Sequence, residues 1–445
     1  MIISVLGTGY VGLVSGVCLA EKGHHVICVD IDPEKVEMTN RGIPIIHESG
    51  LEELLKKNIG NRFRATTNLH QAVLDSELSL IAVGTPYKGN EIDLSYIKEV
   101  SRQIGTVLRE KSTYHVIVVK STVVPGTTQD VVLPALETFS GKKAGVDFGV
   151  GMNPEFLREG VAVEDFMFPD RIVLGGIDEK TIDALEELYG VFDKVDKIKT
   201  TPKTAEMIKY TSNSLLATMI SFSNEIGNLC ASLGDIDVVD VMKAVHLDKR
   251  LCPFLPDGRR IVPQFTTYLE AGCGFGGSCF PKDVKALIAH GKKAGQPMSL
   301  LQSVMQINEQ QPRHVVEILK KQFPTLQGVR LAVLGLAFKP GTDDLRESPA
   351  IPIVKELLAL GAMIQAFDPV ARTEAKKIFG HEQISYSETL LEALNGAEAV
   401  ILLTRWEEFV GLPGILAAKD PPPLFVDGRR MMDKRQFARY AGIGL

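Results

Sequence analysis

The chain begins with a glycine pattern that restricts its fold more than any other feature. A short β-branched run, Ile2 to Leu6, leads directly into Gly7-Thr8-Gly9-Tyr10-Val11-Gly12 and then into a helical pattern. At such a junction the first glycine makes the tight turn, the second lets the backbone approach a pyrophosphate, and the third lets the helix pack against the strand. The pattern predicts a Rossmann-like unit that holds a dinucleotide with these glycines and with Tyr10 and Val11.

An acidic residue closes the second predicted strand. Asp30 stands about 20 residues after the glycines, the spacing at which a carboxylate binds the ribose 2′-hydroxyl. A carboxylate there repels the additional phosphate of NADP, so we predict NAD as the cofactor. Lys35, one turn into the following helix, either reaches the adenosine ribose or phosphate or is a solvated helix residue.

Strand and helix patterns alternate through the first 202 residues. Helical patterns such as 50–58 and 95–109 separate β-branched runs, and buried strands are expected at 2–6, 25–30, 78–83, 115–120 and 148–151. This alternation predicts a doubly wound parallel sheet in an NAD-binding domain that spans residues 1–202.

The next segment reads as helical. Residues 203–233 form a long helical pattern without Gly or Pro before Gly227, a second helix is expected at 237–245, and another begins near Pro281. The long helix has more apolar positions than one face of a monomer would bury. We therefore expect residues 203–325 to form a helical central domain that also makes a homodimer contact.

From Val329 the strand–helix alternation returns. VRLAVLG, a helix at 351–360 and AMIQAFDP repeat the opening ISVLG, helix and HVICVDIDP, with Asp368 in the place of Asp30. The second copy reads LGLAFKPGTDD and has lost the glycine pattern, so we expect it to bind something other than a dinucleotide, or a nucleotide in a different manner. The predicted fold class is α/β, with two Rossmann-like doubly wound parallel-sheet domains joined by a helical central domain.

Composition excludes several classes of protein. The 445 residues are too many for one ordinary core, and the formal net charge of −6 argues against nucleic acid or an anionic membrane surface as a partner. No apolar run approaches the roughly 18 residues that cross a bilayer, and no signal peptide opens the chain, so we expect a cytoplasmic protein. The six cysteines have no metal-ligand spacing, and neither a metal site nor a disulfide scaffold is expected.

Two motifs end predicted strands of the first domain, Val83-Gly84-Thr85-Pro86 and Lys120-Ser121-Thr122-Val123. Ligands bind outside the carboxyl ends of such strands. We therefore expect the cofactor crevice to be lined by Thr85, Pro86, Ser121 and Thr122. Ordinary strand-end turns are the alternative.

The densest pattern after the opening glycines is Gly272-Cys273-Gly274-Phe275-Gly276-Gly277-Ser278-Cys279-Phe280-Pro281-Lys282-Asp283. Its glycines let the backbone lie against a ligand, and Pro281 is typical of the first turn of a helix. A helix start and the nearby Lys282 both favour a thiolate, so Cys279 is the predicted nucleophile, and a structural cysteine is the alternative. Cys273 lacks the helix start and is expected to be inert.

Two further groups of polar residues have two interpretations each. Lys209 and Asn213 project from one face of the long helix, either as an electrophilic pair in a cleft or as a solvated stripe. The segment Asn153-Pro154-Glu155-Phe156-Leu157-Arg158-Glu159-Gly160 puts two carboxylates and an arginine around a turn, and a capped helix start is the alternative.

Taken together, these motifs resemble the UDP-glucose/GDP-mannose 6-dehydrogenases, in order and over essentially the whole chain. The resemblance rests on GTGYVG, GTP, KSTV, NPEFLREG, AEMIKYTSN, GFGGSCFPKD and LGLAFKPGTDDLRESP. It implies that a nucleotide sugar, UDP-glucose before GDP-mannose or a UDP-N-acetylhexosamine, is oxidised at a primary alcohol to a uronic acid with two NAD consumed. A non-catalytic NAD-binding protein is the alternative, and the presence of Cys279, Lys209 and Glu155 argues against it.

The resemblance assigns roles to six side chains. Cys279 would trap the aldehyde as a thiohemiacetal and then carry a thioester. Lys209 and Asn213 would stabilise the developing oxyanion. Asp283 and Thr122 would hold a water that takes up the alcohol proton, and Glu155 would assist the water that hydrolyses the thioester.

The resemblance also implies contacts to both ligands. Residues 326–445 would form the nucleotide-sugar-binding domain. Besides Glu155, Lys209 and Asn213, contacts to the sugar nucleotide are expected from Phe156, Leu157, Arg158, Tyr268, Leu269, Glu270, Ala271, Gly272, Gly276 and Lys339. Contacts on the nicotinamide side are expected from Glu159, Lys282 and Arg346.

The sequence departs from the family between His246 and Tyr268, where its loop is longer than usual. An arginine of this loop contacts the hexose across the dimer in the family, and Arg250, Arg259 and Arg260 all remain candidates for it. Glu270 stands where a basic or other polar residue is common.

Overall fold

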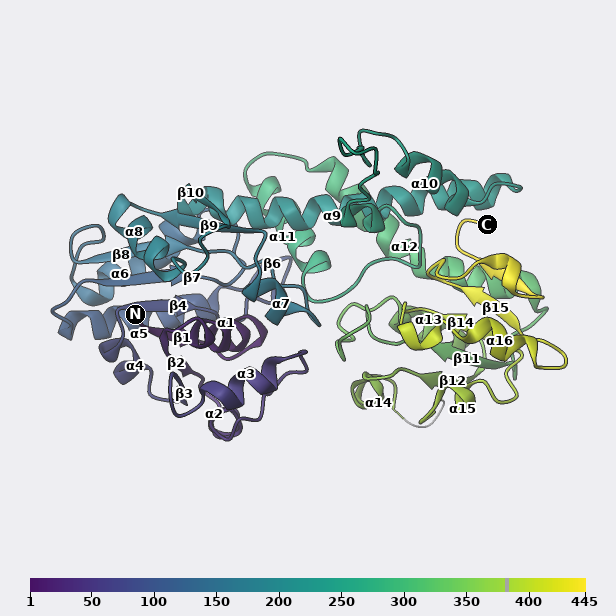
Figure 1. Cartoon of the computed structure of the whole chain (residues 1–445), viewed down its shortest axis with the longest axis horizontal. Helices are drawn as coiled ribbons and strands as arrows, with labels where there is room; N and C mark the ends of the chain where they lie inside the picture. The colour runs from purple at the N-terminus through teal and green to yellow at the C-terminus, as the bar shows by residue number, and fades with distance from the viewer. Residues whose placement is uncertain (381–383) are drawn as a thin grey trace. The chain divides into compact units, whose positions relative to one another are not determined.

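The computed structural model, which describes residues 1–380 and 384–445, divides into two units, Met1–Ser212 and Asn213–Leu445. Each unit is built around one large sheet, and the division falls within the long helix α9 (Pro202–Leu233). Figure 1 labels most of the helices and strands of both units.

Within the described residues, the first unit has an eight-stranded sheet in the order β10-β9-β8-β7-β4-β1-β2-β3. Its strands are β1 (Ile2–Leu6), β2 (His25–Val29), β3 (Phe63–Thr66), β4 (Leu78–Ile81), β7 (His115–Val119), β8 (Phe148–Met152), β9 (Arg171–Gly176) and β10 (Asp196–Thr200), and β5 (Tyr87–Lys88) and β6 (Glu91–Ile92) form a separate hairpin. Its helices are α1 (Tyr10–Glu21), α2 (Pro33–Asn40), α3 (Leu51–Asn58), α4 (Leu69–Asp75), α5 (Ser95–Glu110), η1 (Thr128–Val132), α6 (Leu133–Ser140), α7 (Ala162–Met167) and α8 (Glu179–Leu188).

The predicted α/β class is confirmed, because five β-branched runs form strands β1, β2, β4, β7 and β8 with closely similar bounds. These strands are apolar along their length since both faces of a parallel sheet are covered by helices. One pair departs from the predicted parallel order: β9 joins β8 in the antiparallel direction, and β10 then runs parallel to β9. Apolar runs do not encode strand direction, and antiparallel strands at the edge of a parallel sheet are common.

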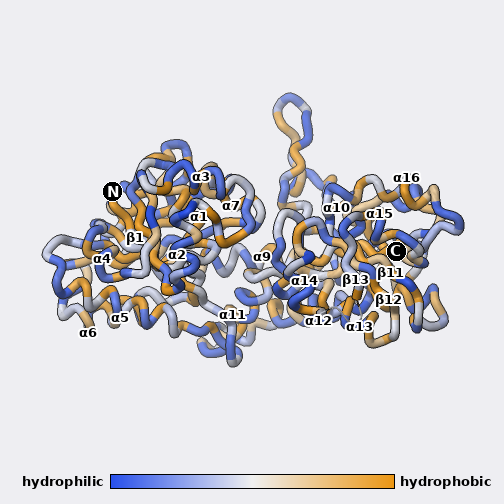
Figure 2. Tube along the Cα trace, turned by 90° about the horizontal axis from the view of Figure 1, so that it is seen from below, coloured by the Kyte–Doolittle hydropathy of each residue, from blue (hydrophilic) through white to orange (hydrophobic). Residues whose placement is uncertain are grey.

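Two separate hydrophobic clusters cover the first sheet. One contains Leu13 and Val17 of α1 with Leu51 and Leu55 of α3, and the other contains residues of α4, α5 and α6. Figure 2 draws β1 in the hydrophobic colour, as expected for a strand between two apolar layers. This arrangement is the doubly wound one.

The strand order reverses at β1, which pairs in parallel with β2 on one side and β4 on the other. Doubly wound folds bind nucleotides outside the carboxyl ends of the strands at such a switch point. The segment Gly7–Gly12 follows β1, and Thr85 follows β4, so both lie at this position.

The second unit has, among its described residues, a six-stranded parallel sheet in the order β13-β12-β11-β14-β15-β16. The strands are β11 (Arg330–Leu334), β12 (Met363–Phe367), β13 (Ile384–Tyr386), β14 (Ala399–Leu402), β15 (Leu424–Asp427) and β16 (Tyr440–Gly442). Beside α9, the helices are α10 (Val238–His246), η2 (Gln264–Tyr268), α11 (Phe280–Lys293), α12 (Ser299–Gln322), α13 (Ala350–Ala359), α14 (Arg372–Phe379), α15 (Leu390–Ala393), η3 (Glu407–Phe409), α16 (Leu412–Ala417) and η4 (Lys434–Gln436).

The helices that precede the second sheet share its core. Val238 and Met242 of α10 and Val315 and Leu319 of α12 belong to the same hydrophobic cluster as the strands β11, β12, β14 and β15. Burial of this common apolar surface is what holds α10 and α12 against the sheet.

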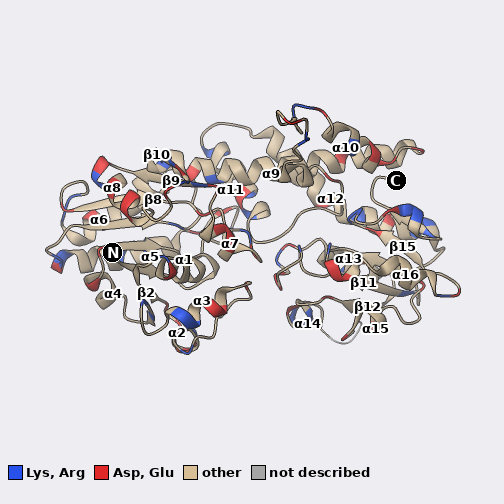
Figure 3. Ribbon diagram, viewed as in Figure 1, with Lys and Arg blue, Asp and Glu red and all other residues tan. Residues whose placement is uncertain are grey.

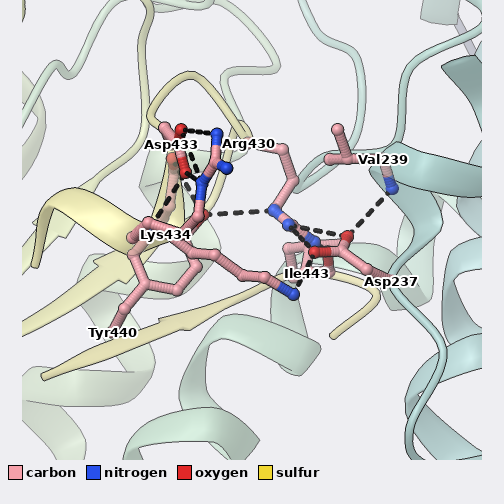
Figure 4. A network of polar contacts seen from close by, with 9 residues as sticks. Asp237, Val239, Arg430, Asp433, Lys434, Tyr440 and Ile443 are labelled. Atoms are coloured by element: carbon pink, nitrogen blue, oxygen red, sulfur yellow. Dashed lines mark hydrogen bonds and ion pairs between the residues drawn. The ribbon is translucent and has the colours of Figure 1, made fainter.

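A buried ion pair also ties α10 to the end of the chain (Figure 4). Arg430 Nη2 donates to both carboxylate oxygens of Asp237 at 2.8 and 2.9 Å, and Arg430 Nη1 donates to the carbonyl of Ile443 at 2.8 Å. Asp237 caps α10 by accepting from the N–H of Val239 at 3.0 Å, and Lys434 lies 2.9 Å from the same carboxylate. The cap and the C-terminal strand therefore depend on one another.

Candidate active site

The glycine turn after β1 has the geometry that a dinucleotide requires. Gly7 has φ = 103°, a left-handed conformation that a side chain disfavours, and a Cβ on Gly12 would lie 1.8 Å from the carbonyl oxygen of Gly7. A Cβ on Gly9 would meet nothing within 4 Å, so the backbone at the start of α1 is open to a phosphate group. Gly7 therefore makes a tight turn, Gly12 packs closely against it, and the residues present fit a dinucleotide at this position.

Asp30 lies beside this turn and is fixed as an acceptor. Its Oδ2 accepts from the N–H of Thr8 at 3.0 Å and from the Thr8 hydroxyl at 2.5 Å, and its Oδ1 accepts from the N–H of Asp32 at 3.0 Å. Burial raises the pKa of Asp30, but these hydrogen bonds and the nearby Lys35 outweigh it and hold the pKa below its usual value. Ile31, next to it, is 90% exposed.

Tyr10 is tied down by Glu48, a residue that sequence reasoning missed. The Tyr10 hydroxyl donates to Glu48, whose two carboxylate oxygens also accept from the N–H groups of Gly160 and Ala162 at 2.8 Å each. Burial and then Glu48 raise the pKa of Tyr10. Glu48 therefore links Tyr10, at the start of α1, to the turn that contains Glu159 and Gly160. Val11 is the next residue of α1. Glu48 stands alone in a loop, so no sequence pattern indicated that it contacts Tyr10.

The hydroxyl residues after β4 and β7 lie together. Thr85 Oγ1 donates to the carbonyl of Thr122 at 2.8 Å, and Ser121 Oγ donates to the carbonyl of Val83 at 2.7 Å. Thr85 and Ser121 are buried, whereas Pro86 is exposed. The structure thus joins the two strand-end motifs beside the glycine turn, as the strand order predicts.

Glu155 and Lys209 form a buried ion pair in the first unit. Lys209 Nζ lies 2.9 Å from Glu155 Oε1, and their side chains are 4% and 5% exposed. Glu155 Oε2 accepts from the N–H of Leu157 at 2.6 Å, and the Phe156 ring centroid lies 5.4 Å from Lys209 Nζ. Lys209 is therefore not part of a solvated stripe. A lysine is almost never buried this deeply unless it is paired with an opposite charge.

Arg158 is placed differently from the three residues before it. Its guanidinium holds Asp165 through two nitrogens, with Nη2 2.6 Å from Oδ1, and its side chain is 53% exposed. The guanidinium next to the Phe156 ring is that of Arg171, 3.9 Å from the ring centroid. Arg171 is a second residue that sequence reasoning missed.

In the second unit, Cys279 directly precedes α11, and Pro281 lies in the first turn of that helix. Cys279 is partly exposed, whereas Cys18, Cys28, Cys230, Cys252 and Cys273 are buried. Burial raises the pKa of the Cys273 thiol, which agrees with its predicted inertness. Among the six cysteines, accessibility and a helix start therefore coincide at Cys279.

Asp283, four residues after Cys279, accepts hydrogen bonds from two side chains. Its Oδ2 accepts from Asn213 Nδ2 at 2.6 Å, and its Oδ1 accepts from Lys282 Nζ at 2.5 Å. Asp283 is 1% exposed and Asn213 is 7% exposed, so the amide of Asn213 is oriented by a buried carboxylate. The N–H of Asp283 also donates to the carbonyl of Cys279 at 2.8 Å, which links this group to the cysteine.

The glycine loop before Cys279 is clamped by residues that no motif indicated. Gly272 donates to Asn224 Oδ1 and accepts from Gln311 Nε2, both at 2.8 Å. Asn308 exchanges two hydrogen bonds with the backbone of Phe275. These side chains stand on α9 and α12, far from the loop in sequence, so only the fold identifies them.

The remaining predicted substrate residues of the second unit lie in two groups. In the stretch 268–272, Leu269 and Ala271 are buried, Tyr268 lies near Phe280, and Glu270 is ion-paired with Arg405. A Cβ on Gly276 would lie 2.2 Å from the carbonyl oxygen of Glu347. The backbone of this chain therefore excludes a side chain at position 276, whether or not a ligand is bound.

Lys339 and Arg346 stand in the loop between β11 and α13. Lys339 Nζ lies 5.6 Å from the Phe338 ring centroid, and Arg346 is paired with Asp344 at 2.7 Å. The candidate arginines of the long loop also have local contacts: Arg250 with Asp248, Arg259 with Asp257, and Arg260 with the Phe254 ring.

Asp368 stands after β12 of the second sheet, where Asp30 stands after β2 of the first. Its Oδ2 accepts from the N–H groups of Leu336 and Ala337 at 2.7 and 3.0 Å, and its Oδ1 accepts from those of Val370 and Ala371. Trp406 Nε1 adds a donor at 3.3 Å. Both carboxylates thus accept from backbone N–H groups of the turn after the first strand of their sheet, but Asp368 is buried whereas Asp30 is only half-buried.

Two absences concern the described residues 1–380 and 384–445. Among them, no group of three or more His, Cys, Asp and Glu side chains is arranged to hold a metal ion. No helix of this part of the chain is long and apolar enough to span a membrane.

The chain matches three domains of one known family. Residues 1–193, 203–310 and 332–434 match, in order, the NAD binding domain, the central domain and the UDP binding domain of the UDP-glucose/GDP-mannose dehydrogenase family.

Similar proteins cover nearly all of the chain. A UDP-glucose 6-dehydrogenase of Haloferax volcanii is 40% identical over 100% of both chains. A GDP-mannose 6-dehydrogenase of Pseudomonas syringae is 41% identical over 97% of this chain and 95% of that protein. The solved structure of a UDP-glucose dehydrogenase from Pyrobaculum islandicum superposes with a TM-score of 0.89 at 40% identity, covering 100% of this chain and 97% of that one.

Proposed function

The chain belongs to the UDP-glucose/GDP-mannose dehydrogenase family and is an NAD-dependent nucleotide-sugar dehydrogenase, and on this basis we propose that it converts UDP-glucose and water to UDP-glucuronate with two NAD reduced. The observation that carries the choice of UDP-glucose is the full-length likeness to UDP-glucose dehydrogenases in both sequence and solved structure. An equally strong sequence likeness to GDP-mannose 6-dehydrogenases makes GDP-mannose the second candidate.

The three regions of the chain divide the work of binding and catalysis. Residues 1–202 bind NAD at the switch point of the first sheet, through Gly7, Gly9, Gly12 and Asp30. When bound, NAD accepts one hydride in each of the two oxidations. Residues 326–445 bind the nucleotide of the substrate, and 203–325 supply Cys279 and the homodimer contact.

In the first oxidation, Lys209 and Asn213 stabilise the negative charge that develops on the sugar oxygen. Glu155, 2.9 Å from Lys209, supports a charged ammonium at that position. Asp283 uses one amide hydrogen of Asn213 and leaves the second to be donated to the oxyanion. Thr122 and Asp283 hold the water that takes up the alcohol proton.

In the second oxidation, the Cys279 thiolate adds to the aldehyde carbon, and the resulting thiohemiacetal loses a hydride to become a thioester. Water, assisted by Glu155 as a base, then attacks the thioester carbon. The C–S bond breaks, the carboxylate leaves, and the thiol is restored. The hydrogen bond from Leu157 keeps the Glu155 carboxylate oriented for this step.

The test is NADH formation with UDP-glucose, GDP-mannose and UDP-N-acetylglucosamine side by side, with the products identified by mass. We expect the highest kcat/KM for UDP-glucose and two NADH per sugar. A Cys279→Ala variant serves as the control, because any NADH that it forms comes from a reaction that does not yield the acid. A higher kcat/KM for GDP-mannose would reassign the substrate, and no NADH from any of the three would refute the proposal.

A further inference from the structure

Glu48 has a buried carboxylate that the reaction above does not use. The residue is 6% exposed and stands in the irregular stretch between α2 and α3. Its Oε2 accepts from the Tyr10 hydroxyl and from the N–H of Gly160 at 2.8 Å, and its Oε1 accepts from the N–H of Ala162 at 2.8 Å. Burying a carboxylate is costly unless hydrogen bonds compensate, and these three donors do so.

The donors come from two helix starts of the first unit. Tyr10 is the first residue of α1, directly after Gly9, and Ala162 is the first residue of α7. The first N–H groups of a helix have no partner within it, so Ala162 needs an outside acceptor, which Glu48 supplies. The N–H of Gly160 also lies 3.1 Å from the Tyr10 hydroxyl. The carboxylate therefore connects the end of the segment before α7 to the helix that follows the dinucleotide turn.

That segment, residues 153–161, contains no helix or strand along its length. No ladder of backbone hydrogen bonds fixes it, so contacts at its two ends must. At its beginning, the N–H of Asn153 donates to the carbonyl of Val119 at 2.9 Å, and Asn153 Nδ2 donates to that of Val173 at 2.8 Å. At its end, Glu48 is the contact that fixes the segment relative to α1.

The position of this segment matters for chemistry, because it carries Glu155 and the residues expected to contact the sugar and the nicotinamide. Hydride transfer needs the two reacting carbons in contact, and a displacement of about 1 Å can slow a reaction by on the order of a hundredfold. A glutamine at position 48 would replace one carboxylate oxygen with an NH2 group that faces another donor. Such a pair leaves a buried N–H without an acceptor and pushes the two parts of the chain apart.

We propose that Glu48 is a positioning residue for hydride transfer: by binding Tyr10 and Gly160 together, its carboxylate sets the place of the segment 155–160 relative to the bound dinucleotide. This inference rests on the proposed function. The glycine turn and Asp30 are held by contacts of their own, so loss of the carboxylate slows hydride transfer without a comparable loss of affinity for NAD.

The test measures NADH formation in single turnovers at saturating NAD, with the better of UDP-glucose and GDP-mannose as the substrate. In Glu48→Gln, we expect the rate constant of the first phase to fall by on the order of ten- to a hundredfold, and the dissociation constant of NAD to change by less than about threefold. Glu53→Gln, the same change at an exposed position of α3, is the matched control and should keep the wild-type rate constant.

Tyr10→Phe tests the other end of the contact. It leaves both N–H groups on the carboxylate, so it should slow the same phase less, by about threefold or more. The double variant should be no slower than Glu48→Gln, because the hydroxyl acts only through Glu48. Additive losses in the double variant would overturn the proposal.

A residue with a structural role alone would lower the melting temperature and the amplitude of the first phase, since fewer molecules are active, but not its rate constant. A wild-type rate constant in Glu48→Gln therefore overturns the proposal. If that variant does not fold, Tyr10→Phe decides by itself, and an unchanged rate constant there is the contrary result. A wild-type enzyme that forms no NADH with any nucleotide sugar refutes the proposed function instead.

Discussion

Lys209 Nζ lies 2.9 Å from Glu155 Oε1, and neither side chain is more than 5% exposed. Removing one member of a buried pair leaves the other charge unpaired, at a cost of about 3–5 kcal/mol. We therefore expect Lys209→Met and Glu155→Gln each to lower the free energy of unfolding, and the double variant to recover part of the loss. Denaturant unfolding of the four proteins gives the coupling between the two sites, and additive effects would contradict it.

The same lysine should affect the first oxidation. Lys209→Ala is expected to slow the first hydride transfer by on the order of a hundredfold or more, as loss of an oxyanion stabiliser does. Single-turnover NADH formation measures this step. Lys203→Ala, on an exposed position of the same helix, is the matched control and should keep the wild-type rate.

Cys279→Ser should stop turnover to the acid. An alcohol is a much weaker acid than a thiol and a poorer nucleophile at neutral pH, and any ester that the serine formed would hydrolyse slowly. The variant should give at most about two equivalents of NADH per site, one for the aldehyde and a second where the serine ester forms, and that ester should be visible as a covalent adduct by mass. Cys273→Ala, at a buried cysteine, should continue to make uronate. Steady production of uronate by Cys279→Ser at a near wild-type rate would rule out the thioester.

Asp30→Ala should weaken NAD use and narrow the preference for NAD over NADP. The change removes an acceptor for the ribose hydroxyl and the repulsion of a 2′-phosphate, and it also deprives Thr8 of its acceptor. The measurement is kcat/KM with each cofactor. Glu34→Ala, in the exposed first turn of α2, should leave both values unchanged. Comparable kcat/KM values with NADP in the wild-type enzyme would contradict the role of Asp30.

We predict a homodimer through α9. Leu215, Phe222 and Leu229 follow one another at seven-residue spacing, which keeps them on one face of a helix, and they are 58%, 50% and 54% exposed. Figure 3 draws α9 almost entirely in tan, in agreement with its few charged residues. Such an exposed apolar stripe is typical of a protein contact.

Phe222→Glu should therefore convert a dimer to a monomer in sedimentation at micromolar concentration. Leu391→Glu is the control, because Leu391 is 66% exposed and lies on α15 in the C-terminal lobe. A wild-type monomer with full activity would count against the interface.

Glu206 should make stability depend on pH. The carboxylate is fully buried, accepts from the N–H groups of Gly126 and Thr128 at 2.5 and 2.8 Å, and has a pKa that burial raises to about 7. A pKa above the unfolded value of 4.5 means that the folded state binds the proton more tightly. The resulting stability is complete below about pH 4.5 and is lost as the pH rises through 7.

Between pH 5 and pH 8.5, the wild-type free energy of unfolding should therefore fall by on the order of 2–3 kcal/mol relative to Glu206→Gln, which has no proton to lose. Only the slope with pH is compared, since the amide also alters a hydrogen bond. Parallel slopes for the two proteins would refute the assignment.

The sequence alone determined the features that depend on local geometry. A tight turn needs Gly7, close packing of helix on strand needs Gly12, and a helix start with Pro281 places Cys279 at an N-terminus. Apolar runs separated by helical patterns likewise predicted β1, β2, β4, β7 and β8 of the first sheet and β11 and β12 of the second. Each of these requirements acts between residues that are neighbours in the chain, so their spacing is visible without a structure.

Tertiary structure decided what depends on distant residues. It turned β9 and β10 against the rest of the first sheet, buried Lys209 against Glu155, and joined Glu48 to Tyr10. It also brought Asn224, Asn308 and Gln311 onto the glycine loop. In the first unit it brought Lys120 within hydrogen-bonding distance of the Asn153 side chain. Burial and charge pairing arise only when segments far apart in sequence pack together, and a side chain's type does not specify which partner it will meet.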